Sequence, residues 1–139
     1  TTSVTYAFGA LEAVMRREKP DFVELNYSLG DRDAETRLLP AAAELGIATL
    51  INIPFGGPGG SNLLRAVQGK PLPDWARDFD AATWGQFLLK YVIANPAVTC
   101  VIPGTRNPDH MADNLGAGRG RLPDPAQRQQ MARFFAELS

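Results

Sequence analysis

Apolar positions along the chain alternate between helical spacing and short continuous runs, and this alternation predicts helices and strands in turn. Helices are expected near residues 8–19, 34–45, 63–67, 84–92, 108–115 and 131–138. Strands are expected at residues 22–25, 47–51 and 98–102, where the runs are short and rich in β-branched residues. The chain therefore has the βα alternation of a parallel sheet covered by helices.

Local signals predict where several of these helices begin and end. Pro20 follows Lys19 and is expected to stop the first helix. Gly46 is expected to end the second helix in a left-handed conformation. Asp33 and Asp80 precede the second and third long helices, so we expect each to cap the N-terminus that follows it.

Both a (β/α)8 barrel and an open doubly wound sheet satisfy this alternation, and the loops favour the barrel. Each polar or glycine-rich segment follows the carboxyl end of a strand, at residues 26–28, 52–60 and 104–110. Ligand loops at that end are the rule in barrels, and the loops after the last two strands commonly bind phosphate. No GxGxxG motif follows the first strand, which disfavours a Rossmann domain.

The run VIPGTRNPDHMADN, residues 101–114, has the layout of an anion site. A buried strand breaks at Pro103-Gly104, and a helix opens near Pro108, where free backbone N–H groups can face a phosphate. Arg106 would supply the main charge. An ordinary strand-to-helix connection carrying a surface arginine has the same pattern, so spacing alone leaves both interpretations open.

Composition narrows the function classes. The chain has 139 residues, 45% of them hydrophobic, and a net charge of −1, which suits one core and favours neither nucleic acid nor a membrane surface as partner. Cys100 lies in an apolar run and is expected to be a small core residue; with a single His, no Cys/His cluster for a metal is expected. No apolar run is long enough to cross a membrane. We expect a cytoplasmic location, although an export signal could lie upstream of Thr1.

The chain resembles the aldo-keto reductases, NAD(P)H-dependent (β/α)8 barrels, and in particular their bacterial members. DFVELNYSLGDRDAETRLLPAAAELGIATLINIPFGG is similar to the family's sixth and seventh strands with the helix between them. NPAVTCVIPGTRNPDHMADNLGA is similar to the eighth strand with its cofactor-binding turn and helix. The resemblance covers essentially the whole chain and implies an oxidoreductase that reduces a small-molecule carbonyl.

The resemblance also implies a cofactor site, carried over position by position. Thr1, Thr2 and Glu24 stand where the family holds the nicotinamide carboxamide, and Asn52 stands where an aromatic residue usually stacks on the ring. Backbone along the pyrophosphate would come from Ile53, Phe55 and Gly57. The remaining positions are those that grip the adenosine 2′-phosphate or contact adenine, namely Gly104, Thr105, Arg106, His110, Asp113 and Asn114.

Several of these positions differ in type from the family pattern. Thr1 and Thr2 replace Ser and Asn, Glu24 replaces a Gln, and Asn52 replaces the stacking aromatic. His110 replaces a frequent Arg or Gln. Arg106 together with a partly protonated His110 favours NADP over NAD.

The family's catalytic Tyr, Lys, Asp and His come from the first four strands, which have no counterpart here, so no catalytic residue is assigned. Tyr6, Tyr27 and Tyr91 do not match that role. A whole barrel takes roughly 250 residues. Residues 1–139 are therefore expected to form one domain, the cofactor-binding C-terminal half of a barrel, with the catalytic N-terminal half absent.

The function predicted from these observations is the cofactor-binding part of an NADP-dependent aldo-keto reductase, inactive as an isolated chain. The expected partner is the missing N-terminal half or a second copy, because open sheet edges and an apolar inner face disfavour a lone half-barrel. Two alternatives remain open. One is a non-catalytic half-barrel that binds a nucleotide or self-associates, and the other is a different phosphate-binding (β/α)8 enzyme such as an aldolase or isomerase.

Overall fold

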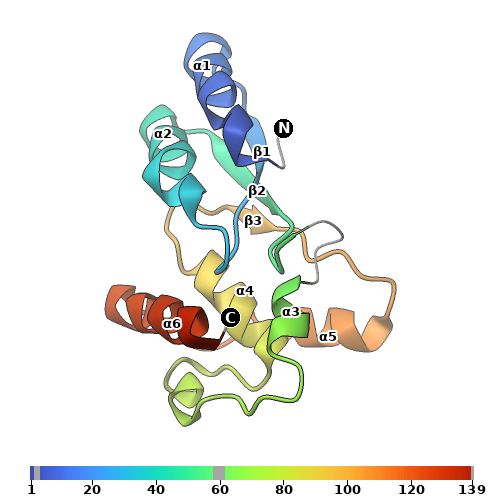
Figure 1. Cartoon of the computed structure of the whole chain (residues 1–139). Coiled ribbons are helices and arrows are strands. Elements are labelled where there is room, and N and C mark those ends of the chain that lie inside the picture. The colour runs from blue at the N-terminus through green and yellow to red at the C-terminus, as the bar shows by residue number, and fades with distance from the viewer. Residues whose placement is uncertain (2–3, 58–61, 139) are drawn as a thin grey trace.

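Three parallel strands and the helices around them form the fold in the computed structural model (Figure 1), which describes residues 1, 4–57 and 62–138. The strands are β1 (Phe22–Asn26), β2 (Ala48–Asn52) and β3 (Cys100–Val101). The α-helices are α1 (Phe8–Glu18), α2 (Leu38–Leu45), α3 (Asn62–Ala66), α4 (Trp84–Ile93), α5 (Pro108–Gly116) and α6 (Pro125–Leu138). Short 3-10 helices precede three of them, namely η1 (Thr5–Ala7), η2 (Asp33–Thr36) and η3 (Asp74–Phe79).

The strands are ordered β1-β2-β3, and both pairings are parallel. The register places Asn26 beside Asn52 and Ile51 beside Val101. Parallel strands with covering helices were predicted from the sequence, and this α/β class is confirmed. The arrangement is consistent with part of a (β/α)8 barrel.

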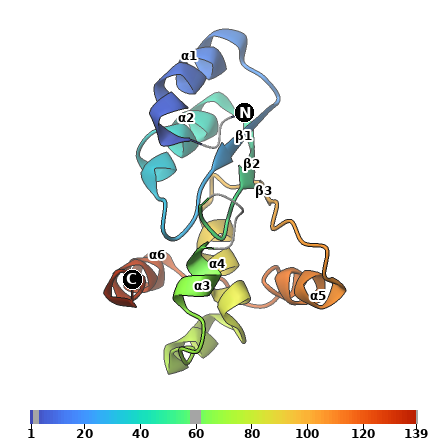
Figure 2. The ribbon, with the colours of Figure 1, turned by 45° about the vertical axis from the view of Figure 1, so that its right-hand side comes forward.

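The two faces of the sheet differ sharply in exposure. Val23 and Leu25 of β1 and Ile51 of β2 are at most 4% exposed because helices cover that face, as the turned view in Figure 2 shows for α1 and α2. Alternate residues point the other way. On that open face Phe22 is 62% exposed, and Ile102, just past β3, is 46% exposed. The open face of the sheet is therefore partly apolar.

β3 is shorter than the strand expected at residues 98–102, and side chains account for the difference. The Thr49 backbone N–H donates to Thr99 Oγ1 at 3.1 Å, and the Thr99 N–H donates to Thr49 Oγ1 at 3.0 Å, so side chains replace the backbone ladder there. Ile102 still donates to the Ile51 carbonyl at 2.8 Å. Pro103 follows, and it has no N–H with which to continue the ladder.

Cys100 is exposed, so its prediction as a core residue is wrong. Its register partner is Leu50, which places both side chains on the open face of the sheet. The apolar run around Cys100 was interpreted as buried on both faces. In the described residues only one face of β3 is covered, and Val101 lies on it.

Helix ends follow the sequence signals in part. Gly46 ends α2 with φ 68°, as predicted. Asp33 begins η2 instead of capping α2, which starts after Arg37 without a side-chain cap. Asp80 ends η3 in a left-handed conformation with φ 56°, and the residue that caps α4 is Thr83. Both cap predictions at aspartates are therefore wrong.

The core below the sheet is built on α4, which lies between α6 and α5 in both views (Figures 1 and 2). Trp75, Phe87 and Phe134 bring η3, α4 and α6 together through edge-to-face ring contacts at 5.5 Å. Lys90 is fully buried in this core, and its Nζ donates to the carbonyls of Arg119 and Arg121 at 2.6 and 2.8 Å. These bonds fix the chain between α5 and α6.

Candidate cofactor site

Three loops leave the sheet at the same edge because the strands are parallel. They follow β1 at Asn26, β2 at Asn52 and β3 at Val101. Most of the residues predicted to touch a cofactor lie in or just before these loops. Thr1 is exposed near the N-terminus, and Thr2 lies outside the described residues.

On β1 and β2, Glu24 and Asn52 form a hydrogen-bonded pair. Asn52 Nδ2 donates to Glu24 Oε1 at 2.9 Å. Since an ionised carboxylate only accepts hydrogen bonds, this contact fixes the Asn52 amide so that Oδ1 is its free end. Asn52 Oδ1 is buried and has no hydrogen-bond partner in the described structure.

Asn26, the register partner of Asn52, also has a side-chain oxygen that accepts no hydrogen bond from any described residue. Its Nδ2 donates to Asp31 Oδ2 at 2.5 Å, and its buried Oδ1 has no partner among the described residues. Two orphaned amide oxygens on neighbouring strands thus lie close to the Glu24 carboxylate. Buried acceptors without donors cost about 1–3 kcal/mol each, so this edge of the sheet suits a ligand that supplies N–H groups.

The loop after β2 has the backbone of a binding loop. Ile53 has φ 43°, a strained value for a β-branched residue, and Gly56 and Gly57 have φ 76° and 65°. Gly56 donates to the Ile53 carbonyl at 2.9 Å, and Leu63 donates to the Phe55 carbonyl at 2.9 Å. A Cβ on Gly57 would lie 1.9 Å from Asn62 Nδ2, so the close turn requires glycine there.

The turn between β3 and α5 carries the residues predicted to grip phosphate. Asn107 caps α5 by accepting from the Asp109 N–H at 2.9 Å, and Pro108 occupies the first turn, as the sequence predicted. Thr105 Oγ1 accepts from the Asn107 N–H at 3.1 Å. Arg106 and His110 are exposed beside this turn, and Arg106 forms no ion pair with any residue that the structure describes.

Gly104 lies at the mouth of this turn. A Cβ built on it would meet nothing within 4 Å, so no contact among the described residues requires a glycine there. The space in front of Gly104 is open to a ligand.

Asp113 and Asn114, further along α5, are engaged within the chain. Asp113 Oδ2 accepts from Thr83 Oγ1 at 2.8 Å, and Asn114 Nδ2 donates to the Pro103 carbonyl at 3.3 Å. The contact with Thr83 was not foreseen. Its signal in the sequence is the capping-box spacing of Thr83 and Gln86, three residues apart.

None of the three tyrosines is placed as a catalytic acid at these loops. Tyr27 is fully buried, and its hydroxyl donates to Glu35 and accepts from Arg128. Burial and the bond to Glu35 raise the pKa of Tyr27 well above its usual range. Tyr91 lies on α4 beside the same Glu35, and Tyr6 is 91% exposed on η1.

The groups at these loops fit a ligand that carries both N–H donors and phosphate. Orphaned acceptors at Asn26 and Asn52 match the N–H groups of a carboxamide, and the positive-φ loop offers backbone to a pyrophosphate. Arg106, which has no ion pair among the described residues, lies beside a helix N-terminus and matches a phosphate.

A parallel α/β sheet with its polar loops gathered at the carboxyl edge is typical of (β/α)8 enzymes. The chain matches the model of the Aldo/keto reductase family over residues 5–132, and it belongs to that family, whose members are oxidoreductases. No curated protein matches the chain. Among the described residues, no helix is both long and apolar enough to span a bilayer.

Proposed function

We propose that the chain binds NADPH for the reduction of a small-molecule aldehyde or ketone. The observation that carries the proposal is Arg106, exposed and without an ion pair in the described structure, beside the capped N-terminus of α5. Arg106 and Thr105 hold the 2′-phosphate, and the backbone of residues 53–57 lies along the pyrophosphate. The cofactor supplies the hydride that reduces the carbonyl carbon.

At the nicotinamide end, Glu24 and Asn52 accept hydrogen bonds from the carboxamide NH₂. Glu24 only accepts hydrogen bonds, and Asn52 presents its Oδ1 because its Nδ2 faces Glu24. A hydrogen bond from the carboxamide to the orphaned Asn52 Oδ1 adds to the free energy of cofactor binding. In a site open to solvent, water would otherwise make this hydrogen bond. The pair orients the ring at the edge of the sheet.

The catalytic proton donor comes from elsewhere in the active enzyme. General acid catalysis needs a group within hydrogen-bond reach of the carbonyl oxygen. Tyr27, in the loop after β1, and Tyr91, on α4, are both buried against Glu35, so neither takes that role. The chain supplies cofactor binding, and complementary strands supply the acid.

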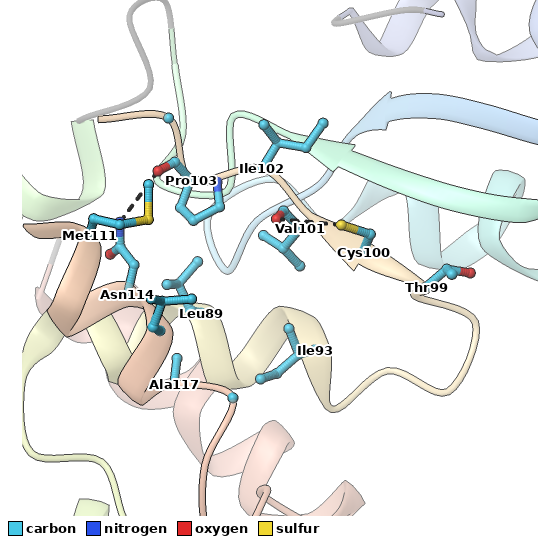
Figure 3. Close-up of a pocket in the computed structure, with 13 residues that line it drawn as sticks. Leu89, Ile93, Thr99, Cys100, Val101, Ile102, Pro103, Met111, Asn114 and Ala117 are labelled. Carbon is cyan, nitrogen blue, oxygen red and sulfur yellow. Dashed lines mark hydrogen bonds between the residues drawn. The ribbon is translucent and has the colours of Figure 1, made fainter. Parts of the chain in front are cut away.

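A groove beside β3 is the surface on which those strands dock. It has a volume of about 620 Å³ between α4, β3 and α5, and Figure 3 shows Leu89, Val101 and Met111 facing it. β3 pairs with β2 on one side, so its other edge is available for a further strand. Apolar side chains from such a partner would cover the groove and the exposed Leu115.

The test is the binding of NADPH and NADH to the Arg106→Ala variant of the full-length protein. A charge-assisted contact to phosphate is worth about 1.5–3 kcal/mol, so the Kd for NADPH should rise by roughly one to two orders of magnitude. The Kd for NADH should stay unchanged, since it lacks the 2′-phosphate. Arg133→Ala, which removes an exposed arginine on α6, is the matched control and should change neither.

Equal weakening of both cofactors, or no weakening of either, would remove the 2′-phosphate role. A chain that binds both cofactors equally well and never supports turnover would instead be a nucleotide-binding module without catalysis.

A further inference from the structure

The N-terminus of α4 forms a small hydrogen-bonded unit. Thr83 caps the helix by accepting from the Gln86 backbone N–H at 3.1 Å, and Gln86 Oε1 accepts from the Ala82 N–H at 3.0 Å. This arrangement resembles a capping box, except that Gln86 bonds the N–H of the residue before the cap. It leaves the Thr83 hydroxyl proton and the Gln86 Nε2 group free to donate to a neighbour.

Asp113 of α5 is that neighbour. Its Oδ2 accepts from Thr83 Oγ1 at 2.8 Å, and its Oδ1 accepts from Gln86 Nε2 at 2.9 Å. The carboxylate therefore lies at the positive end of α4, where the helix dipole favours a negative charge. Both of its oxygens are held by one helix end.

Two glycines, one on each helix, permit this approach. A Cβ on Gly85 would lie 2.8 Å from Asp113 Oδ2, and a Cβ on Gly116 would lie 2.6 Å from Gln86 Nε2. Either methyl group would push the two helices apart or turn a hydrogen-bonding side chain away. The contact of Thr83 and Gln86 with Asp113 is thus built into the packing of α4 on α5, and we call it the α4–α5 lock.

Asn114, the next residue, makes a second contact that holds α5. Its Nδ2 donates to the Pro103 carbonyl in the loop that leaves β3, a bond drawn in Figure 3. Asp113 and Asn114 therefore fix α5 against α4 and against the end of β3. Thr105, Arg106 and His110 lie in the sequence between Pro103 and Asp113. Their positions therefore depend on the contacts of Asp113 with α4 and of Asn114 with Pro103.

We infer that Thr83 and Gln86 are positioning residues for the phosphate-binding turn at residues 105–110, acting through Asp113, and that Asp113 itself does not touch the cofactor. The inference rests on the proposed function, since it assumes that Arg106 meets the 2′-phosphate. It assigns the adenosine end of the site to Arg106, His110 and Asn114. It also implies that the N-terminus of α4 contributes to the selectivity for NADPH over NADH.

The test compares Thr83→Val, which keeps the shape and loses the hydroxyl, with Thr83→Ser, which keeps the hydroxyl. Thr83→Val should raise the Kd for NADPH by about three- to tenfold and change the Kd for NADH by less than about twofold. Thr83→Ser should bind both as the wild type does. Asp113→Asn should reproduce Thr83→Val, because its amide nitrogen cannot accept a hydrogen bond and one of the two carboxylate acceptors is lost.

A double-mutant cycle separates this inference from the proposed function. If Thr83 acts through Arg106, Thr83→Val should weaken NADPH binding no further in the Arg106→Ala background. Loss of both cofactors in equal measure on Asp113→Asn would mean that Asp113 contacts the shared adenosine, and no change in either variant would mean that the lock positions nothing. Either result overturns the inference while the NADPH-specific loss in Arg106→Ala stands. If that loss is missing, the proposed function fails, and the inference falls with it.

Thermal unfolding of each variant guards against a purely structural effect. A variant that is only destabilised would keep the wild-type ratio of the Kd for NADPH to the Kd for NADH at temperatures below its melting transition. A changed ratio at a temperature where the variant is fully folded supports positioning, and an unchanged ratio contradicts it.

Discussion

Arg128 Nη2 lies 2.6 Å from Glu35 Oε1, and this ion pair joins α6 to η2 across 93 positions of sequence. The same Glu35 oxygen accepts from the hydroxyls of Tyr27 and Tyr91, and the Arg128 guanidinium lies 4.5 Å from the centre of the Tyr91 ring. One carboxylate thus holds β1, α4 and α6 together. The cluster fastens α6 beneath the sheet that carries the loops of the candidate site.

Removing the guanidinium should destabilise the fold. Arg128→Met keeps the alkyl stem but leaves Glu35 with only tyrosine hydroxyls, and hydrogen bonds to charged groups are worth about 1.5–3 kcal/mol. We expect a loss of that size in the free energy of unfolding. Urea unfolding followed by tryptophan fluorescence measures it, because Trp75 and Trp84 both contact Phe134 of α6.

Arg77→Met is the matched control. Arg77 pairs with Asp74 at 3.2 Å, but the side chains are 82% and 95% exposed, so the change should cost less than about 0.5 kcal/mol. Equal losses in the two variants would show that the Glu35 cluster contributes no more than a surface pair.

The same cluster makes stability fall at alkaline pH. Burial raises the pKa of Tyr91 from 10.0 to about 12, and it raises the pKa of Tyr27 further. Above pH 10 the unfolded chain releases these protons while the folded protein keeps them, so stability is full below about pH 10 and is lost as the pH rises. Each tyrosine can contribute up to about 1.4 kcal/mol per pH unit.

Urea unfolding between pH 9 and pH 11.5 checks this prediction. Burial lowers the pKa of Lys90, which has the opposite effect on stability, so the informative comparison is between the wild type and Tyr91→Phe. The variant should be less stable at neutral pH, because it loses the bond to Glu35, and should decline less steeply above pH 10. Parallel profiles for the two proteins would contradict the prediction.

Much of the fold could be predicted because its signals are local. Periodicity located β1, β2 and α5 within a residue or two, and Gly46 marked the end of α2. The prediction that Asp80 caps α4 was wrong because the partner of Asp80 is distant in the sequence. It accepts from the Arg121 backbone and side chain, 41 positions away, and Arg121 lowers its pKa, while Thr83 takes the cap.

In the candidate site, too, local signals predict some features, and others depend on how distant elements pack. The turn proposed to bind phosphate could be predicted from Gly104, Asn107 and Pro108, whose effects are local. The contact of Asp113 with Thr83 depends on how α5 packs on α4, and the Glu24–Asn52 pair depends on strand register. The Glu24–Asn52 pair has no signal at short sequence range. The spacing of Thr83 and Gln86 indicates a helix cap but not its contact with Asp113, so both contacts could be seen only in the folded structure.

The chain by itself should lack carbonyl reductase activity and should associate. Among the described residues, the loops hold no general acid paired with a base that could activate it. The exposed Phe22, Ile102 and Leu115 leave apolar surface that water disfavours. An assay of residues 1–139 with NADPH and an aromatic aldehyde should give only background turnover. Light scattering should show dimers or larger species, and a clean monomer at high micromolar concentration would contradict the docking role of the groove.

Coexpression with a polypeptide that supplies the complementary strands is the positive counterpart. It should yield a monodisperse complex and restore turnover. Turnover by residues 1–139 alone that disappears in Tyr27→Phe would show instead that the acid lies within this chain.

The acceptor oxygens of Glu24 and Asn52 should make the protein select for the carboxamide NH₂ of the cofactor. An analogue with an acetyl group in place of the carboxamide has no N–H to offer and would leave the Asn52 Oδ1 orphaned, at a cost of about 1–3 kcal/mol. We therefore expect the acetyl analogue of NADP to bind about tenfold or more weakly than NADP itself. Thionicotinamide, which keeps its NH₂, should bind nearly as well as the natural cofactor.

Glu24→Gln tests the cause of this selectivity. A glutamine can donate as well as accept, so it can offer an N–H to the acetyl oxygen, and it no longer forces Asn52 to present Oδ1. The variant should bind the acetyl analogue within about threefold of NADP, while Asn52→Asp, which adds a second acceptor-only group beside Glu24, should bind neither well. Fluorescence titration measures the dissociation constants of both cofactors. If Glu24→Gln still discriminates against the acetyl analogue as strongly as the wild type does, selection for the NH₂ arises at other residues. The Glu24–Asn52 pair would then serve only to hold β1 against β2.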